Sequence, residues 1–413
     1  MRIGTFRKID FFLGIPACFL LSLILNIKKY LFPVRKTVIH AQNILFLEFS
    51  ETGAVILAYP AIKKIKERYP NASIYLWIFK ESAEFIDLLK VIPRENIILM
   101  RSANIFTLLA DALKNIQEIR RYKIDTVIDM ELFSRFSSVL SYLSGAKNRV
   151  GFYRYTLEGL YRGNLHTHKV AYNVYAHISK NFISLVQSLY APLDNIPLLK
   201  NLWEDVDYSL PKISISNQNR QFIWSKLRLA SNLLNEKDAI ILINFYLDDK
   251  INIRQWAVEN YLELIRRLLE NTDALIILIG ATSGNAASIF PKHERCINLI
   301  DKTTLHELVS LFNISVMLIS SDGRMVHLAS LSDIYIVALF GPETPLLYGP
   351  LTKNKKTFYK GFACSPCLSA YNYKNSICRD NQCMKAITVD EVYDAVLEIM
   401  ERTRGMQKSP HQK

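Results

Sequence analysis

Short apolar runs alternate with longer helical patterns along this chain, and the alternation occurs twice. Asn43 to Phe49 and Ser73 to Phe79 are rich in Ile, Leu and Phe, and the amphipathic pattern of Pro60 to Tyr69 lies between them. Strands that alternate with helices in this way form parallel sheets, because each helix carries the chain back across the sheet. The sequence therefore predicts an α/β fold.

The predicted elements fall into two groups. The first has strands at 43–49, 73–79, 97–100, 126–130 and 149–152, with helices at 60–69, 106–121 and 133–143. The second has strands at 239–244, 274–280, 316–320 and 334–340, with helices at 258–270 and 305–311. Prolines and polar residues interrupt the pattern at 191–218.

Two similar domains are also what the length predicts, since 413 residues exceed what one hydrophobic core normally serves. We expect two doubly wound, Rossmann-like domains at 41–205 and 206–400, followed by a tail at 401–413. Ligands of open parallel sheets bind at the carboxyl ends of the strands, so we expect a site in a cleft between two such domains.

Residues 1–40 form a separate basic and apolar segment. They carry seven cations, Arg2, Arg7, Lys8, Lys28, Lys29, Arg35 and Lys36, against Asp10 alone, which makes seven minus one, or +6, of the net charge of +13. Because nearly half of the excess charge lies here, the charge does not indicate nucleic-acid binding. It flanks the apolar run from Phe11 to Leu25 and suits the anionic lipid headgroups of a cytoplasmic leaflet.

This apolar run predicts a membrane-associated helix that dips into the bilayer. Fifteen residues of helix cover about 22 Å, less than the roughly 30 Å of a hydrocarbon core. A full span that includes Ile27 to Phe32 and a buried helix of a soluble domain are the alternatives. Asn26-Ile27-Lys28 follows the run where a cleaved signal peptide has small residues, so we expect no cleavage.

A polar loop between a strand and a helix predicts the ligand. Ser320-Ser321-Asp322-Gly323-Arg324 follows an apolar strand, and a helix is expected to open at Asp322. Free backbone N–H groups at a helix N-terminus bind phosphate groups, so the loop predicts a diphosphate-linked substrate, such as a nucleotide-linked one.

Several motifs in order along the chain resemble glycosyltransferase family 9, which includes the ADP-heptose:lipopolysaccharide heptosyltransferases. They are Tyr59-Pro60-Ala61, Ile128-Asp129, Ser144-Gly145-Ala146, Arg149-Val150-Gly151-Phe152, Arg254-Gln255-Trp256, Asp322 with His327, and Phe340-Gly341-Pro342. The resemblance implies a GT-B fold, an NDP-sugar donor such as ADP-heptose on the second domain, and an acceptor facing the first. It also implies inverting transfer without an obligatory metal.

The same resemblance assigns the donor side. Arg254 would neutralise charge on the leaving diphosphate, Asp322 and Gly323 would orient the donor, and His327 would bind it. Arg324 replaces a family glycine and could pair with the diphosphate. Thr303 and Thr304 match the place of a nucleotide contact. The alternatives are a solvated Arg254, a packed His327, and helix capping by Asp322 and by the threonines.

The family's general base is missing. The residue after Gly53 is an aspartate in the heptosyltransferases and Ala54 here. Glu51 on the same loop is our candidate base, with Glu48, Asp129 and Glu131 in reserve. Two hypotheses remain open: a membrane-attached glycosyltransferase acting on a lipid-linked acceptor of lipopolysaccharide or another surface glycan at the cytoplasmic face of the inner membrane, and a degenerate relative that binds an NDP-sugar or a partner without turnover.

Two further groups of side chains are candidates for binding an acceptor or a metal. Polar side chains between 149 and 177 suit an anionic or polyhydroxyl acceptor or a scattered surface; they are Arg154, Arg162, His166, His168, Tyr172 and His177. Four cysteines follow the spacing Cys364-x2-Cys367-x10-Cys378-x4-Cys383, which suits a structural zinc with four thiolate ligands. The nearby cations Lys360, Lys374 and Arg379 would favour thiolates. An iron–sulfur cluster and four free thiols are the alternatives.

Overall fold

The computed structural model divides the chain into two compact units. One unit contains Met1–Tyr208 and Ala370–Tyr373, and the other contains Ser209–Ser369 and Lys374–Lys413. The structure describes residues 3–32, 41–49, 52–154, 160–193, 197–200, 203, 206–231, 234, 238–247, 253–282 and 289–407. The sequence did not indicate that residues 370–373 belong with the first unit.

The first unit is built on a six-stranded parallel sheet with the strand order β3-β2-β1-β4-β5-β6. Its strands are β1 (Asn43–Glu48), β2 (Ser73–Phe79), β3 (Ile97–Met100), β4 (Thr126–Asp129), β5 (Asn148–Tyr153) and β6 (His168–Ala171). Its helices are α1 (Ile3–Leu31), α2 (Thr52–Leu57), α3 (Tyr59–Arg68), α4 (Ala83–Leu89), α5 (Ile105–Arg121), α6 (Arg135–Leu143) and α7 (Ile178–Gln187).

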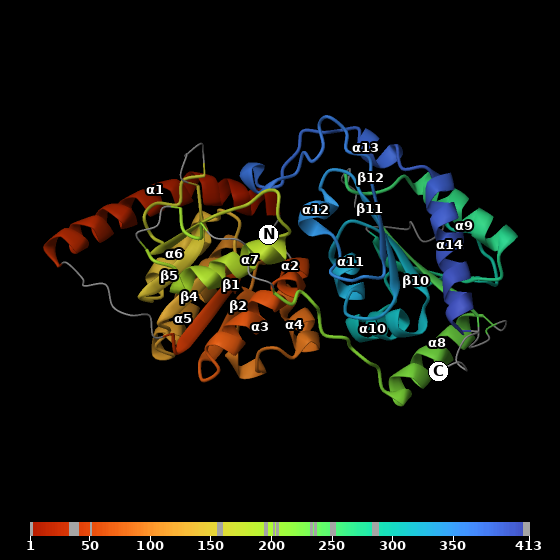
Figure 1. Ribbon diagram of the computed structural model, residues 1–413, viewed down its shortest axis with the longest axis horizontal. Coiled ribbons are helices and arrows are strands. Elements are labelled where there is room, and N and C mark those ends of the chain that lie inside the picture. The colour runs from red at the N-terminus through yellow and green to blue at the C-terminus, as the bar shows by residue number, and fades with distance from the viewer. Residues whose placement is uncertain are drawn as a thin grey trace. The chain divides into compact units, whose positions relative to one another are not determined.

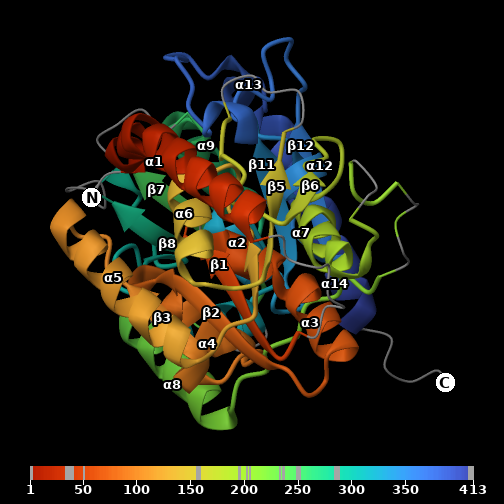
Figure 2. The same cartoon turned by 90° about the vertical axis from the view of Figure 1, so that its left-hand side faces the viewer.

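Apolar side chains on both faces of this sheet explain its layers. Leu45 and Leu47 of β1 and Trp77 of β2 are fully buried in a core that also contains residues of α5 and α6. The α3 and α7 helices pack together, and α1 lies along α6 on the outside of the unit (Figures 1 and 2). Strands covered by helices on both sides are buried on both faces, which is why their sequences are almost continuously apolar.

The second unit repeats the architecture with the strand order β12-β11-β10-β7-β8-β9, again all parallel. Its strands are β7 (Ile240–Leu247), β8 (Leu275–Thr282), β9 (Cys296–Asn298), β10 (Met317–Ser321), β11 (Tyr335–Phe340) and β12 (Lys355–Tyr359). Its helices are α8 (Asn217–Ala230), α9 (Val258–Asn271), α10 (Leu305–Ile314), α11 (Arg324–Ala329), α12 (Pro345–Tyr348), α13 (Gln382–Lys385) and α14 (Val389–Gln407).

Helices cover both faces of this second sheet. The α9 and α14 helices lie on one side and α10 and α11 on the other (Figure 1). The fully buried Trp256 and Tyr261 join the core between the sheet and α9. The predicted α/β fold with two doubly wound sheets is therefore confirmed.

The predicted elements omit several helices, among them α4, α7, α8 and α14, and some of the strands. Three short strands, β6, β9 and β12, were missed, and each lies at the edge of a sheet. Edge strands are covered less and carry polar residues such as Lys355 and Lys356, so they lack the apolar signal of central strands. The predicted tail at 401–413 is also wrong in part, since α14 continues to Gln407.

The N-terminal helix differs most from its prediction. α1 runs from Ile3 to Leu31 and continues through Gly14 and Pro16, so it extends beyond both ends of the apolar run from Phe11 to Leu25. Within the described residues, the stretch Arg7–Leu31 is the one helix long and apolar enough to cross a membrane. The argument that this segment is too short to span is therefore wrong, because it counted only the residues from Phe11 to Leu25.

One glycine of the first sheet is required by close packing. A Cβ atom on Gly151, in β5, would come within 2.5 Å of the His166 ring, and that ring is 3.1 Å from Asp129 in the buried interior. The ring has little room to withdraw because His166 is only 3% exposed.

We expect Gly151→Ala to destabilise the first unit by about 1–3 kcal/mol, since the new methyl group overpacks a filled interior. Denaturant unfolding monitored by circular dichroism measures the change. Gly323→Ala is the control, because no heavy atom lies within 4 Å of a Cβ placed there. Equal stability of the two variants would contradict this account of β5.

Candidate active site

Three neighbouring strands of the second sheet end in segments that carry charged side chains. β11, β10 and β7 lie side by side, and Glu343, Asp322 and Arg254 follow them in that order. Because parallel strands place their carboxyl ends at one edge of the sheet, residues far apart in the sequence meet there.

The meeting point is a cluster of two cations and two carboxylates, which we call the Arg254 cluster. Arg254 donates from Nη2 to Oε1 of Glu343 at 3.0 Å, and its Nε lies 3.9 Å from Oδ2 of Asp322. The Nζ of Lys374 lies 3.2 Å from the same Oε1 of Glu343 and 4.1 Å from the centre of the Tyr348 ring. Glu343 thus holds two cations at once.

The side chains of the Arg254 cluster differ in how deeply they are buried. The side chains of Asp322 and Glu343 are 4% and 2% exposed, whereas that of Arg254 is 24% exposed. The carboxylates therefore lie inside and the guanidinium faces solvent. A ligand that approaches this edge meets positive charge first, and planar guanidinium groups bind phosphate oxygens through paired hydrogen bonds.

The segment that carries Arg254 is fixed from two sides. Trp256 is fully buried and donates from its indole nitrogen to the carbonyl of Ile387 at 2.9 Å. The side-chain amide of Asn381 donates to the carbonyls of Ile253 at 3.2 Å and Gln255 at 2.9 Å. Arg254 therefore stands on a held backbone, which supports the functional interpretation over that of a solvated surface arginine.

Sequence reasoning missed two members of this cluster. Glu343 directly follows Phe340-Gly341-Pro342, so its place after a strand was a usable signal. Lys374 lies in the cysteine-rich segment, where we expected it to favour thiolates. Nothing in the sequence shows that it instead turns to Glu343.

The Asp322 loop differs from its prediction. α11 begins at Arg324, its N-cap is Gly323, and no side chain caps it. The alternative that Asp322 is a plain helix cap is therefore wrong, and its carboxylate faces Arg254 instead. Arg324, in the place of the family glycine, is the first residue of α11 and does not have a positive φ, so it imposes no strain on the backbone. Its side chain is exposed.

The other predicted donor residues lie elsewhere on the unit. Thr304 accepts from the N–H of Glu307 at 3.3 Å and forms a capping box at the start of α10. Capping of α10 accounts for the hydrogen bond of Thr304, and Thr303 is the residue before it in the chain. His327 is buried within α11. Donor binding by these three residues stays a prediction.

On the first unit, the candidate base Glu51 lies outside the described residues. Ala54, which stands where relatives in the family carry an aspartate, is partly exposed on α2. The reserve carboxylates Glu48, Asp129 and Glu131 are all buried. Glu131 accepts from the N–H of Phe49, which ties the end of β1 to the segment after β4.

Asp129 is enclosed in a network of donors. Its Oδ2 accepts hydrogen bonds from Arg162 and from the hydroxyl of Ser137, the latter at 2.9 Å. The same oxygen lies 3.1 Å from Nε2 of His166. Burial opposes its ionisation, but Arg162 and His166 outweigh burial and lower its pKa. A fully buried carboxylate with these partners holds the fold and does not reach a substrate.

The polar side chains between 149 and 177 are largely interior. Arg162, His166, His168 and Tyr172 are at most 8% exposed. Arg162 donates to the carbonyl of Phe152 at 3.0 Å and to the hydroxyl of Ser138 at 2.6 Å. The expectation of a scattered surface is therefore wrong for these residues, and they fasten β5 and α6 in place.

The four cysteines do not form the predicted ligand set. Within the part of the chain that the structure describes, no group of three or more His, Cys, Asp or Glu side chains is placed to hold a metal ion. None of the four forms a disulfide, and Cys378 donates to the carbonyl of Asp380. Burial, followed by the neighbouring cysteines, raises the pKa of Cys383.

Two of the three cations expected to stabilise thiolates pair with carboxylates instead. Lys360 pairs with Glu391, and Lys374 with Glu343. The zinc prediction is therefore not supported by the structure.

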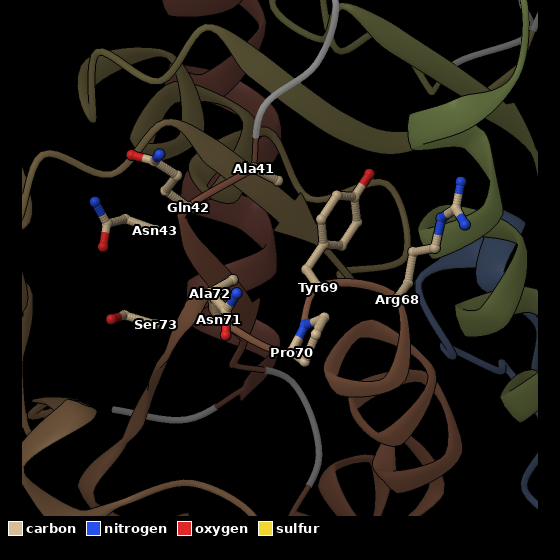
Figure 3. A pocket seen from close by; sticks show the side chains of 9 residues that line it. All are labelled: Ala41, Gln42, Asn43, Arg68, Tyr69, Pro70, Asn71, Ala72 and Ser73. Atoms are coloured by element: carbon tan, nitrogen blue, oxygen red, sulfur yellow. The ribbon is translucent and has the colours of Figure 1, made fainter.

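The first unit has a pocket of about 420 Å³ at the amino ends of its strands (Figure 3). It is formed where β1 and β2 begin, at residues 41–43 and 71–73, and Arg68 and Tyr69 project from the end of α3. It contains no residue predicted for the site. Because ligands of parallel sheets bind at the carboxyl ends, we do not assign substrate binding to it.

Two doubly wound parallel sheets, the second with cations at the carboxyl ends of its strands, match the GT-B architecture of glycosyltransferases. Residues 112–377 match the model of glycosyltransferase family 9 (heptosyltransferase). The match covers more than half of the chain, so the protein belongs to glycosyltransferase family 9 and is an enzyme of that class.

Individual relatives agree. The chain is 21% identical to lipopolysaccharide heptosyltransferase 3 of Escherichia coli over 321 residues, which are 75% of this chain and 85% of that protein. Its fold is similar to that of E. coli ADP-heptose lipopolysaccharide heptosyltransferase II, with a TM-score of 0.61, 16% identity and coverage of 88% and 100%. A family 9 glycosyltransferase from Veillonella parvula gives a TM-score of 0.65 at 16% identity, with coverage of 89% and 99%.

The buried histidines predict a pH dependence of stability. Burial, followed by Arg162 for His166 and by Arg149 for His168, lowers the pKa of each to about 4. The unfolded chain binds these protons near pH 6.5, and the folded chain does not until about pH 4. We therefore expect the free energy of unfolding to fall between about pH 6.5 and pH 4, by up to about 1.4 kcal/mol per pH unit for each histidine.

Denaturant unfolding across this range measures the slope. In His168→Gln, which removes one titrating group, the slope should be about half as steep. A slope unchanged by the substitution would show that His168 is protonated in the folded chain.

Proposed function

We propose that this enzyme transfers a heptose from ADP-heptose to a lipid-linked acceptor of lipopolysaccharide or another surface glycan, with inversion, at the cytoplasmic face of the inner membrane. The observation that carries the proposal is the Arg254 cluster at the carboxyl ends of β7, β10 and β11 in a family 9 chain. Relatives named as lipopolysaccharide and ADP-heptose heptosyltransferases support the sugar, nucleotide and acceptor.

The cluster suits the departure of a nucleoside diphosphate. As the bond between sugar and phosphate breaks, negative charge grows on the leaving phosphate oxygen, and nearby fixed cations stabilise it. Arg254 is partly exposed and held by buried carboxylates, so it is already oriented before the donor arrives. Lys374 adds a second cation on the same carboxylate. Arg324, exposed at the start of α11, is a third candidate contact.

The acceptor side belongs to the first unit in this proposal. Inverting transfer needs a base that removes the proton of the acceptor hydroxyl as the hydroxyl attacks the sugar. Glu51 follows β1 in the chain and is our proposed base. We favour Glu51 over Asp129 as the base, because the carboxylate of Asp129 is already bonded to Arg162, Ser137 and His166.

A specific observation also favours a second candidate function. Ala54 cannot act as a base, and it stands in the position of the family's aspartate. If no other carboxylate takes over, the protein binds an NDP-sugar or a partner without turnover. Donor binding is common to both functions, whereas turnover separates them.

We expect Arg254→Ala and Lys374→Ala each to weaken the binding of ADP by about 10–100-fold, since each removes a charge-assisted contact to phosphate. Isothermal titration calorimetry with ADP measures the effect. Lys385→Ala is the matched control, because Lys385 pairs on the surface with Asp380 and should leave the affinity within about twofold. Unchanged ADP affinity in both cluster variants would exclude the cluster as the diphosphate site.

We expect Glu51→Gln to lower kcat by about 100-fold or more while ADP affinity is kept, since only proton removal is lost. The assay follows ADP release from ADP-heptose with acceptor in a membrane fraction. Glu67→Gln, an exposed carboxylate on α3, is the control. If wild type and Glu51→Gln both bind ADP without turnover, the second candidate function holds; equal turnover in both would assign the base to another group.

A further inference from the structure

Helix α1 has the reverse of an ordinary amphipathic pattern. Asp10, Cys18 and Ser22 are buried against the first unit and Gly14 is partly buried; these residues are polar or small and recur every four positions. Residues spaced by four lie on one face of a helix. This face packs along α6 and the segment after residue 160 (Figures 1 and 2).

The first half of α1 is fastened by Asp10. Its carboxylate accepts from the backbone N–H of Phe136 at 2.7 Å and of Arg135 at 3.2 Å, so a residue of α1 caps the start of α6. The fully buried Arg135 guanidinium lies 3.5 Å from the same carboxylate. Removing α1 would leave these N–H groups and a buried cation without this acceptor, which is costly.

The second half is fastened by close backbone packing. The hydroxyl of Ser22 accepts from the N–H of Asn164 at 2.7 Å. A Cβ atom on Gly163 would lie 2.7 Å from the carbonyl oxygen of Cys18, and one on Gly14 would lie 2.6 Å from Cβ of Arg135. Small residues that let backbones approach closely, with polar groups bonded across the contact, are typical of helices whose other side meets lipid.

The outer face of α1 is apolar without interruption. Every exposed residue between positions 11 and 25 is apolar: Phe11, Phe12, Leu13, Pro16, Phe19, Leu20, Leu23 and Ile24. Exposed cations stand beyond both ends, with Lys8 before this stretch and Lys28 and Lys29 after it, followed by Tyr30 at 88% exposure. Cations and an aromatic ring at the borders of an apolar face match the headgroup region of an anionic leaflet.

The fastening points decide how α1 meets the bilayer. Asp10 and Ser22 are twelve residues apart, about 18 Å along the helix, and both bond to the same folded unit. A helix that crossed roughly 30 Å of hydrocarbon would have to release one of these ends from the unit. A helix that lies in the plane of the membrane keeps both.

We propose that α1 is a monotopic element: it stays docked on the first unit through its polar and small face and inserts its apolar face into one anionic leaflet. This refines the membrane attachment in the proposed function and rests on it. Vesicle binding is measured without turnover, so failure of this inference is distinguishable from failure of the transferase proposal.

The first experiment is co-sedimentation of the full chain with vesicles of phosphatidylethanolamine and phosphatidylglycerol. Leu20→Asp/Ile24→Asp places charges on the outer face, four positions apart and both more than half exposed, so the fold should be kept. We expect at least about tenfold weaker vesicle binding than for wild type. Wild type should also bind vesicles of phosphatidylcholine alone more weakly, because the flanking cations lose their partners.

The matched control is Leu109→Asp/Leu113→Asp on α5, two exposed leucines with the same spacing. It should bind vesicles as wild type does. Thermal unfolding checks that both double variants are folded. Vesicle binding lost only in the α5 variant would overturn the proposal. So would a dimer in solution that becomes monomeric in the α1 variant with vesicle binding unchanged, since a second copy would then cover the face.

The second experiment tests the in-plane orientation. A protease-sensitive tag is placed before Met1, and protease is added to spheroplasts and to inside-out membrane vesicles. The docked helix keeps the tag on the cytoplasmic side, so cleavage is expected in inside-out vesicles only. Cleavage in spheroplasts would show that α1 crosses the membrane.

Discussion

Parallel pairing of β7, β10 and β11 is the constraint on which the candidate active site depends. It brings the segments after three central strands to one edge of the sheet, and so Arg254, Asp322 and Glu343 meet although Arg254 and Glu343 are 89 positions apart. A shifted strand order would separate them. The core beneath, with the buried Trp256 and Tyr261, keeps this edge in place because both side chains bond to neighbouring segments.

The carboxylates at strand ends have different cationic partners in the two units. The carboxylate of Asp129 at the end of β4 contacts Arg162 and His166, so its charge is balanced inside the fold. Asp322 and Glu343 are also buried, but their cationic partner Arg254 is partly exposed. Breaking the buried Asp129–Arg162 pair would leave an uncompensated charge inside the fold, whereas Arg254 reaches solvent and is available to an anionic ligand. This difference separates the structural network from the proposed donor site.

The two faces of the N-terminal helix α1 also differ in their partners. Its polar and small residues face protein and its apolar residues face outward, so the unit displays an apolar surface that its own fold does not cover. An enzyme held in the plane of a leaflet by such a face stays near an acceptor whose lipid remains in the bilayer. Docking through Asp10 and Ser22 also orients the first unit relative to that surface.

Central strands, the two-sheet architecture and the position of Arg254 and Asp322 in segments after strands were readable from the sequence, because apolar strands and the loops that follow them are local signals. Edge strands such as β6 were not, since partial burial weakens the apolar pattern. The pairing of Glu343 and Lys374 with the Arg254 cluster and the enclosure of Asp129 were decided by tertiary structure alone. Whether a charged or thiol group binds a ligand or holds the fold depends on which partner it reaches through space, and spacing along the chain does not specify that partner.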